Sequence, residues 1–360
     1  MDDFELDAFE SYAKIVVIGV GGAGSNAVNQ MLEEKIANIE FWVFNTDAQA
    51  LATSKAENRL VLGRQTTRGL GAGGDPQVGR EAALDSVDDI KRVIEGANMV
   101  FIAAGMGGGT GTGAAPVVAK LAKDAGALTV AIVTRPFSFE GEKRRKNAIE
   151  GINKLKENVD AIIIVSNDKL MMMNGTRPIS EAFAESDRVL AQSVKTITDL
   201  IVVPGVINLD FADVRSTLKD KGLALIGFGS GTGPKKANDA ASSALLSPLL
   251  EASIHGAHSI IANVTCGNNV SLDEVKEAID YVTSAAGNNP NIIFGVQANP
   301  ELNDQMLISI VATEFDNDFD PFSENATPVV TPVTPLKEEQ VEEDDGEEES
   351  ILPSFLNGND

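Results

Sequence analysis

Residues 105–116 read GMGGGTGTGAAP, and six of the first nine residues in this stretch are glycine. Glycine loses more backbone entropy on ordering than any other residue, so this density does not suit a regular helix or strand. The stretch follows an apolar run, MVFIAA (99–104), and precedes a run of small residues. It therefore predicts a loop between a strand and a helix, where something approaches the backbone so closely that side chains are excluded.

A second glycine loop, GVGGAG (19–24), follows the apolar run KIVVIGV. Alone it fits the dinucleotide fingerprint of an NAD-dependent oxidoreductase, and Asp47 lies where such an enzyme keeps its ribose carboxylate. NAD has no need of a second loop as dense as 105–113, whereas a triphosphate can be held by backbone N–H groups and helix N-termini. Thr110 and Thr112 would add hydroxyl donors.

Two further observations bear on whether and how the 105–113 loop binds phosphate. A glycine-rich packing turn is the alternative for 105–113, and we expect packing to explain one or two of its glycines but not six. The pattern G-x-x-x-x-G-K-[ST] occurs nowhere in the chain, which excludes a Walker-type phosphate loop. The sequence thus predicts phosphate binding by backbone donors and helix dipoles.

Apolar runs alternate with helical patterns from residue 14 to residue 166, which predicts a parallel sheet covered on both faces. The expected strands lie at 14–20, 40–45, 60–62, 99–104, 128–134 and 160–166. Helices are expected from Ser25, from Pro76 to about Glu95, from Thr112 and over 142–158. A long helix (179–202) then precedes a second block, with helices at 211–220, 235–250 and 271–285 and strands at 223–229, 259–265, 292–298 and 306–313. The last two strands are expected to pair as a hairpin, which would make the second sheet mixed.

The net charge of −24 is uneven, because residues 316–360 hold fourteen acidic side chains against one lysine, Lys337. This acidity argues against a nucleic-acid partner, and the Pro, Thr, Glu and Asp content beyond residue 315 predicts disorder. The single cysteine, Cys266, excludes a disulfide within the chain and fits a reducing compartment. The acidic start and the lack of a long apolar run predict a cytoplasmic location without membrane insertion.

The motif GGGTGTG resembles the signature of the tubulin/FtsZ family. Other stretches are similar to the bacterial cell-division members of that family, and the resemblance covers residues 14–315 almost continuously. These stretches are NTDAQAL (45–51), TRGLGAGGDP (67–76), TRPFSFEG (134–141), SEAF (180–183), PGVINLDFADV (204–214) and ILPSFL (351–356).

The resemblance implies an α/β fold: a Rossmann-like parallel-sheet GTPase domain, a long central helix, a smaller α/β domain with a mixed sheet, and a disordered acidic tail. The expected divisions are a flexible N-terminus (1–13), a GTP-binding domain (14–178), the central helix (179–203), a C-terminal domain with the catalytic loop (204–315), an acidic linker (316–350) and a partner-binding peptide (351–360). The ligands implied are GTP, GDP and Mg²⁺, with the metal held mainly through the phosphates and by no fixed protein ligand.

The resemblance also implies site residues. Phosphate contacts are expected from Gly21, Gly22, Ala23, Gly24, Ser25, Asn26, Gly108, Gly109, Thr110 and Gly111. Ala72 and Gly73 would close over the terminal phosphate, unless the loop 68–79 is only a long surface turn. Glu140 and Arg144, at a spacing of one helical turn, would contact ribose and phosphate, and the alternative is a surface ion pair.

Asn26, Asn167, Phe183 and Asp187 are the residues that would read the base, according to the resemblance. A carboxylate accepts two hydrogen bonds from N1–H and the exocyclic amine of guanine, whereas adenine offers no such pair. Phe183 would stack on the base, and an ordinary core phenylalanine is the alternative. Such a set predicts a preference for GTP over ATP.

Asp210 and Asp213 in INLDFAD stand three residues apart at an expected helix start, and helix capping alone explains that spacing. The resemblance implies a further role, in which this segment enters the nucleotide site of the neighbouring subunit. Asp210 and Asp213 would orient the attacking water, and Asn208 would contact the nucleotide or its metal. His255 and His258 are expected to be structural.

The function implied is GTP hydrolysis coupled to head-to-tail polymerisation into protofilaments. The family forms a division ring at the septum, at midcell, and its C-terminal peptide binds division proteins and membrane-tethering adaptors. The family's tail usually carries a basic residue, and Asn357–Asp360 has none. A non-catalytic GTP-binding scaffold and the NAD-dependent oxidoreductase remain as alternatives.

Overall fold

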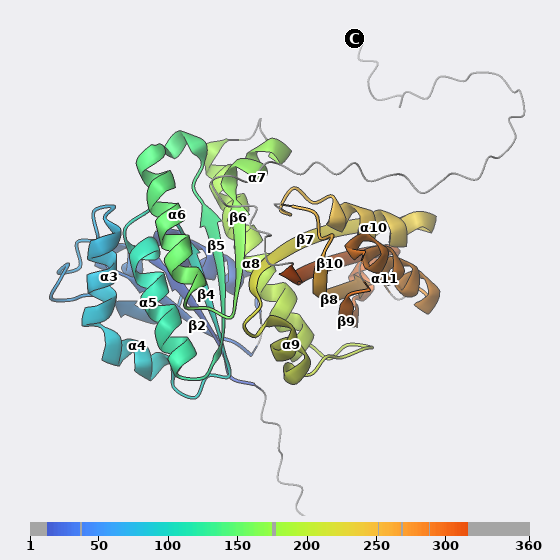
Figure 1. Ribbon diagram of the computed structural model, residues 1–360, viewed down its shortest axis with the longest axis horizontal. Coiled ribbons are helices and arrows are strands. Elements are labelled where there is room, and N and C mark those ends of the chain that lie inside the picture. The colour runs from blue at the N-terminus through green and yellow to red at the C-terminus, as the bar shows by residue number, and fades with distance from the viewer. Residues whose placement is uncertain are drawn as a thin grey trace, which may run out of the picture. The chain divides into compact units, whose positions relative to one another are not determined.

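The computed structural model describes residues 13–36, 38–174, 178–250, 252–267, 269–287 and 289–315. Within these residues the strands form one ten-stranded sheet in the order β3-β2-β1-β4-β5-β6-β7-β10-β8-β9. Figure 1 shows the parallel strands of the N-terminal half and the strands of the C-terminal half. The expectations for 1–12, the acidic linker and the C-terminal peptide lie outside the described residues.

The N-terminal half is a parallel sheet wound in both directions from its centre. Strand β1 pairs with β2 on one side and with β4 on the other. The chain adds β2 and β3 on the first side of β1 and then crosses over to add β4, β5 and β6 on the second side. The strands are β1 (Ile15–Val20), β2 (Glu40–Asn45), β3 (Asn58–Val61), β4 (Met99–Gly105), β5 (Leu128–Arg135) and β6 (Ala161–Ser166). The helices between them are α1 (Gly21–Glu33), α2 (Ala48–Ala52), α3 (Pro76–Asp85), α4 (Val87–Ile94), α5 (Thr110–Asp124) and α6 (Glu142–Lys156).

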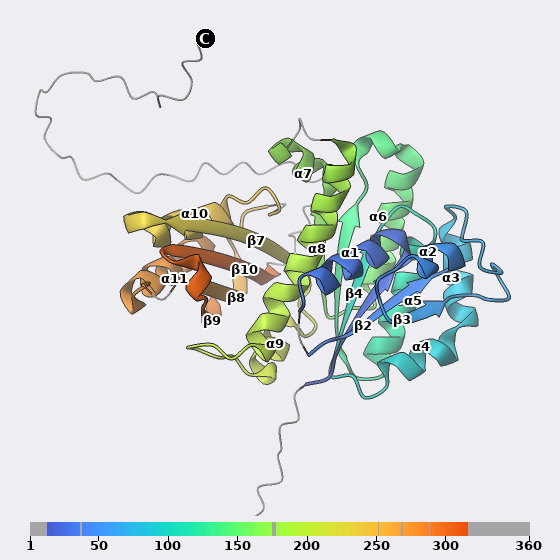
Figure 2. The ribbon, with the colours of Figure 1, turned by 180° about the vertical axis from the view of Figure 1, so that it is seen from behind.

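Side chains alternate between the two faces of this sheet, and both faces are buried. In β1, Ile15 and Val17 pack into one core, whereas Val16, Ile18 and Val20 pack into the other. Figure 1 looks onto the face covered by α3, α4, α5 and α6, and Figure 2 looks onto the face covered by α1, α2 and α8 (Ile179–Val202). The expectation of a doubly covered parallel sheet is confirmed, and two covered faces explain the continuous apolar runs.

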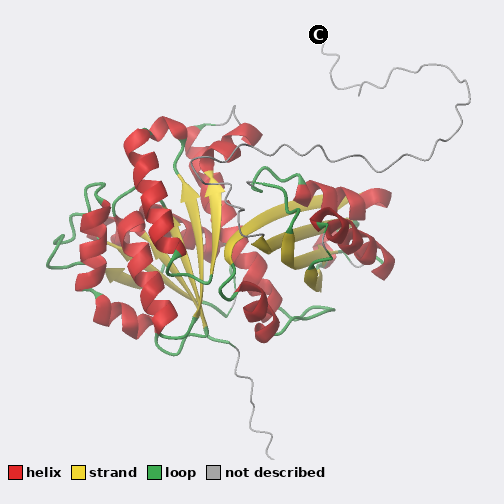
Figure 3. Ribbon diagram, in the orientation of Figure 1, coloured by secondary structure: helices red, strands yellow, loops and turns green. Residues whose placement is uncertain are grey.

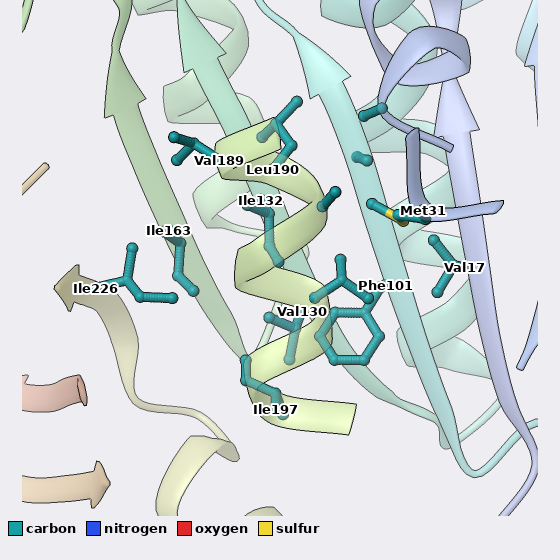
Figure 4. Packing of buried hydrophobic residues seen from close by; sticks show 14 of the residues in the cluster. Val17, Met31, Phe101, Val130, Ile132, Ile163, Val189, Leu190, Ile197 and Ile226 are labelled. Carbon is teal, nitrogen blue, oxygen red and sulfur yellow. The ribbon is translucent and has the colours of Figure 1, made fainter. Parts of the chain in front are cut away.

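Helix α8 packs along the sheet between the two halves. Its residues Val189, Leu190 and Ile197 face Ile132, Val130 and Phe101 of the parallel strands (Figure 4). The same core includes Ile226 of β7 (Gly222–Thr232), so α8 joins the halves through apolar packing. The backbone ladder between the halves is short, because β6 and β7 pair only over Ala161–Ile163 and Gly222–Ala224.

The C-terminal half is a mixed sheet, and the predicted hairpin of its last two strands is wrong. Strand β9 (Asn291–Ala298) pairs in parallel with β8 (Ala257–Cys266), whereas β10 (Gln305–Phe315) inserts antiparallel between β7 and β8. The reason is that α11 (Leu272–Ala286) forms a β8–α11–β9 crossover, which fixes β9 as a parallel edge strand. The remaining helices here are α9 (Phe211–Leu218) and α10 (Lys236–Leu245), and in Figure 3 the helices of this half are red and its strands yellow.

Several helix boundaries differ from the sequence expectation. Helices α1 and α5 begin at Gly21 and Thr110, earlier than expected, because glycines are accommodated in the first turns of both helices. The helix expected over 76–95 is divided at Ser86, whose hydroxyl accepts the Gly63 N–H at 2.8 Å. Two short helices were not expected, α2 and α7 (Asn167–Asn174). No helix in the described part of the chain is long and apolar enough to cross a bilayer.

Candidate functional site

A cavity of about 440 Å³ lies at the carboxyl ends of β1, β4, β5 and β6. Because β1 and β4 are neighbours and the winding reverses between them, this is the switch point of the sheet, where open α/β sheets bind ligands. The two glycine loops therefore meet, as the sequence predicts. The lining residues are Gly22, Ala23, Asn26, Gly105, Met106, Gly108, Gly109, Thr110, Gly111, Thr134, Pro136, Glu140, Arg144, Asn167, Phe183, Ser186 and Asp187.

Most glycines of the 105–113 loop serve contacts within the protein. A Cβ on Gly113 would stand 1.9 Å from the Pro76 carbonyl oxygen, and one on Gly111 would stand 2.6 Å from the Gly105 carbonyl oxygen. A Cβ on Gly109 would meet Ala72, and Gly107 has a φ of +105°. Packing thus explains more than the one or two glycines expected from sequence. Gly108 is the exception, since a Cβ there would meet nothing within 4 Å.

Two helix N-termini face the cavity. Gly22 and Ala23 belong to the first turn of α1, and Thr110 and Gly111 to the first turn of α5. The N–H groups of a first turn have no partner within their own helix, and the helix dipole adds partial positive charge there. This wall of the cavity therefore suits an anion such as a phosphate chain.

The two threonines of the 105–113 loop behave differently. Thr110 lines the cavity, and its hydroxyl lies 2.7 Å from the hydroxyl of Thr46. The Thr112 hydroxyl is buried and accepts the Gly107 N–H at 2.8 Å. Thr112 therefore supports the loop from behind and is not among the residues that line the cavity, so a donor role for its hydroxyl stays a prediction.

The opposite wall is built from α7 and α8. Asn167 begins α7, whereas Phe183, Ser186 and Asp187 share one face of α8 at spacings of three and four residues. Phe183 is 41% exposed, so it is not a core residue, and it makes an edge-to-face contact with Phe137. Burial raises the pKa of Asp187 to about 7. The wall thus presents an aromatic ring, an amide and a carboxyl group that binds a proton readily.

Glu140 and Arg144 are in contact at the rim of the cavity. They form an ion pair, and the second Glu140 oxygen accepts the Phe137 N–H at 2.9 Å. They do not share a helix, because Glu140 ends a 3-10 helix (Ser138–Glu140) and α6 begins after Gly141. The ion pair and the cavity position coexist, so the two interpretations of this pair are compatible.

Five of the predicted nucleotide-binding residues are not among those that line the cavity. A Cβ on Gly21 or Gly24 would meet backbone atoms of Gly111 or Ala103. The Ser25 hydroxyl donates to the Gly21 carbonyl at 2.8 Å, so it is turned into its own helix. Ala72 is buried behind Gly109, and Gly73 stands in a surface loop with a φ of +58°.

The three predicted catalytic residues also lie outside this cavity lining. Asp210 is the N-cap of α9, where its carboxylate accepts the Asp213 N–H at 2.7 Å, and Asn208 accepts the Gly205 N–H. Asp210 therefore caps α9, as the capping interpretation expects. Asp210 and Asn208 are exposed and Asp213 is half-buried, so all three can meet another molecule.

Asp47, which an oxidoreductase would use, is the N-cap of α2 and accepts the N–H groups of Gln49 and Ala50. It does not line the cavity. Across the described residues, no group of three or more His, Cys, Asp or Glu side chains is placed to hold a metal ion. The expectation that Mg²⁺ is held through phosphates stays a prediction.

Sequence reasoning missed several lining residues, among them Thr134, Pro136 and Ser186. Thr134 is the last residue but one of β5 and Pro136 follows that strand, so the rule that ligands bind at carboxyl strand ends points to both. Ser186 carried a signal too, because it stands three residues after Phe183 and directly before Asp187. A cavity-facing stripe on α8 includes it.

Comparison with known proteins decides the family. Residues 14–175 match the model of the tubulin/FtsZ family GTPase domain, and residues 222–316 match that of the FtsZ family C-terminal domain. The empty FtsZ dimer of M. jannaschii superposes with a TM-score of 0.83 at 40% identity, covering 91% of this chain and 95% of that chain. The chain belongs to the tubulin/FtsZ family.

Other solved tubulin/FtsZ structures extend this likeness. A point mutant of M. jannaschii FtsZ matches with a TM-score of 0.81 at 43% identity, over 84% of this chain and 91% of that chain. CetZ2 from Haloferax volcanii, solved as a GTPγS-bound protofilament, matches with a TM-score of 0.71 over 83% of this chain and 92% of that chain. Its identity of 22% shows the shared fold alone. Because these proteins are archaeal, membership of the bacterial branch stays a prediction.

Proposed function

We propose that the protein binds and hydrolyses GTP and assembles head-to-tail into filaments. The observation that carries this proposal is a cavity with helix N-termini on one wall and a base-sized recognition surface on the other, within a tubulin/FtsZ GTPase domain. The phosphates would lie against the first turns of α1 and α5, contacted by Gly22, Ala23, Gly108, Thr110 and Gly111. The base would lie toward α7 and α8.

The wall toward α7 and α8 suits guanine. The Asp187 carboxylate can accept from N1–H and the 2-amino group, Phe183 can stack on the ring, and Asn167 and Asn26 supply amide groups. Adenine has an acceptor at N1 and no 2-amino group, so it would leave Asp187 without donors. Glu140 and Arg144 would contact the ribose and the phosphates. Gly21, Gly24, Ser25 and Ala72 would support these loops from behind, and Gly73 would close over the terminal phosphate from its surface loop.

We further propose that hydrolysis needs two subunits. Asp210 and Asp213 do not line the cavity of their own chain, yet both are accessible at the start of α9. In a head-to-tail contact they would enter the cavity of the next subunit and orient the attacking water, with Asn208 beside them. Phosphoryl transfer relies mainly on positioning and charge stabilisation, so two fixed carboxylates suffice for slow turnover. Bound Mg²⁺ would neutralise phosphate charge.

A head-to-tail contact does not close on itself and therefore builds filaments. The FtsZ relative was solved as a dimer, which supports self-association. We propose that the filaments form the division ring at midcell, and that residues 351–360, outside the described residues, bind division proteins and membrane-tethering adaptors. The domain boundaries at 178, 203 and 315 stay predictions.

The proposal is tested by phosphate release from GTP, measured per protein molecule over a series of protein concentrations with Mg²⁺ present. Specific activity near zero below a threshold, followed by a rise, is expected for a site formed between subunits. A constant specific activity would mean that each chain hydrolyses GTP alone and would refute the shared site. GTP binding without turnover at any concentration would instead favour a non-catalytic scaffold.

Replacing Asp187 by alanine should weaken GDP binding by about 2 kcal/mol, roughly 30-fold, because two donors of the base lose their acceptor. ADP binding should change far less, so the preference for guanine should fall. Calorimetric titration of both nucleotides measures the two effects. An unchanged GDP affinity would remove Asp187 from the recognition site.

Guanine binding should also depend on pH. Because burial raises the pKa of Asp187 to about 7, the carboxylate that accepts from guanine disappears as the pH falls through that value. GDP affinity should therefore be about tenfold lower at pH 6 than at pH 8, in proportion to the ionised fraction. Titrations of the Asp187→Asn variant provide the control, since that variant should lack this dependence.

A further inference from the structure

The loop between α8 and α9 is attached along the edge strand β9. The N–H groups of Val206 and Ile207 both donate to the Val296 carbonyl oxygen, at 2.8 and 3.2 Å, and the Val296 N–H donates to the Ile207 carbonyl at 3.0 Å. The last turn of α8 is tied to the same strand, because the Gln297 side chain donates to the Asp199 carbonyl oxygen at 3.0 Å. Strand β9 therefore holds this loop both where it begins and in its middle.

Gly205 makes the close approach to β9 possible. A Cβ at this position would stand 2.5 Å from the Val296 carbonyl oxygen, the same atom that accepts two N–H groups of the loop. The φ of Gly205 is not among the positive values of the chain, so the backbone conformation itself would admit another residue. The contact with β9, rather than the turn, is therefore what requires glycine here.

Gly205 also sets the orientation of the Asn208 amide. The backbone N–H of Gly205 donates to the Oδ1 atom of Asn208. A backbone N–H can only donate, so the end of the amide that faces it must be the oxygen. The NH₂ group of this exposed side chain is then left for another molecule. An NH₂ group donates to a phosphate oxygen, whereas a magnesium ion requires an oxygen ligand.

We infer that Gly205 is a positioning residue for hydrolysis, because together with β9 it fixes the loop that carries Asn208 and leads to Asp210 and Asp213. The inference rests on the proposed function and deepens it, since it assigns Asn208 to a phosphate oxygen of the neighbouring subunit's nucleotide rather than to the metal. Phosphoryl transfer relies on positioning, and a displacement of about 1 Å can cost about 100-fold in rate. An edge strand of one subunit thus sets the geometry of a site on the next.

The test uses the full chain and three measurements: GDP affinity below the assembly threshold, sedimentation of filaments with GTP, and turnover per sedimented subunit. Gly205→Ala should bind GDP as the unchanged protein does, because Gly205 does not line the cavity of its own chain. Its turnover should be about tenfold lower or less, because the displaced loop misplaces the groups it carries.

Gly227→Ala in β7 is the matched control. Its Cβ would stand 2.3 Å from the Ala244 carbonyl oxygen, so this substitution also forces a side chain against backbone in the C-terminal half. It should lower the stability of the protein but leave turnover per sedimented subunit unchanged. The comparison separates general destabilisation from displacement of the loop.

A second pair of variants tests the attachment to β9 without any change in the core. Val206→Pro removes one of the N–H groups that donate to Val296, whereas Val206→Ala keeps it. The Val206 side chain is 74% exposed, so neither substitution disturbs buried packing. Val206→Pro should lower turnover by about tenfold, and Val206→Ala should leave it within about twofold of the original value.

Asn208→Asp tests which group of Asn208 meets the neighbour. The variant keeps an acceptor for the Gly205 N–H and replaces the NH₂ group by an oxygen. Turnover should fall about 100-fold, because a donor to the phosphate is lost and a negative charge takes its place. Turnover that is kept or raised would show that Asn208 serves the metal and would overturn this assignment.

Four other results would overturn the positioning role of Gly205. These are unchanged turnover in Gly205→Ala, an equal loss of turnover in Gly227→Ala, equal effects of Val206→Pro and Val206→Ala, and a Gly205→Ala chain that no longer sediments with GTP. The last result would assign Gly205 to the filament contact instead. A failure of the proposed function looks different, because the unchanged protein would then hydrolyse GTP with the same specific activity at every concentration.

Discussion

An Asp213→Ala variant should bind GTP as tightly as the unchanged protein and hydrolyse it at least about 100-fold more slowly. The carboxylate stands in the first turn of α9, half-buried and outside the lining of its own cavity. Its loss therefore leaves the nucleotide contacts of that chain intact and removes only what it offers to a neighbour. Nucleotide affinity below the assembly threshold and phosphate release above it are the two measurements.

The control must separate chemistry from helix stability, because an acid in a first turn also favours the helix dipole. Asp273 occupies the first turn of α11 and is exposed, so Asp273→Ala removes a comparable dipole contribution far from the proposed site. That control should retain turnover. Equal loss in both variants would reduce the role of Asp213 to helix stability.

Mixing two inactive variants sharpens this test. The Asp213→Ala chain keeps a complete cavity, whereas the Asp187→Ala chain keeps its acids but recognises the base poorly. In random head-to-tail filaments at equal amounts, about a quarter of the contacts would join an intact cavity to intact acids. At subsaturating GTP, the mixture should therefore be more active than the average of its components. Activity equal to that average would contradict a shared site.

The second large effect is expected on the stability of the protein, when Gly113 is replaced by alanine. Alanine is normally better than glycine inside a helix by about 1 kcal/mol, so propensity alone predicts stabilisation. In α5, however, the new Cβ would stand 1.9 Å from the Pro76 carbonyl oxygen and 2.6 Å from the Arg80 backbone nitrogen. Backbone cannot move aside as a flexible side chain can, so Gly113→Ala should destabilise the protein by about 3 kcal/mol or more. Thermal or denaturant unfolding measures this loss.

Gly108→Ala is the counterpart in the same loop. No atom lies within 4 Å of its added Cβ, and Gly108 lines the cavity. The free energy of unfolding should stay within about 0.5 kcal/mol of the original value, while GDP affinity should fall because the methyl group occupies ligand space. Similar destabilisation by both substitutions would contradict the division of this loop into packing and binding glycines.

The strands and the site's position could be predicted from sequence, because both depend on local patterns. A run such as IVVIGV is apolar at every position, and burial on both faces of a parallel sheet follows. The meeting of the two glycine loops follows in the same way from regular winding. The pairing of β9 could not be predicted, since its partner is set by the distant β8 and the intervening crossover.

Side-chain contacts between different helices and strands are the second kind of feature that could not be predicted from the sequence. Nothing near Ser186 in the sequence indicates that its hydroxyl turns to Asn167, nineteen residues earlier. The glycine pattern led to too many glycines being assigned to ligand binding. Glycine density indicates close approach to the backbone, but not whether a ligand or another part of the chain approaches, and at Gly113 the approaching group is the carbonyl of Pro76.

The short ladder between β6 and β7 has a mechanical consequence. Only Ala161–Ile163 and Gly222–Ala224 are paired there, whereas β4 and β5, which border the cavity, pair over seven residues each. Any load that pulls the two halves apart would break this joint before the neighbouring ladders. The remaining contact, around α8, is apolar packing, which is non-directional and can yield by sliding. A filament of such subunits would bend at the joint within each subunit.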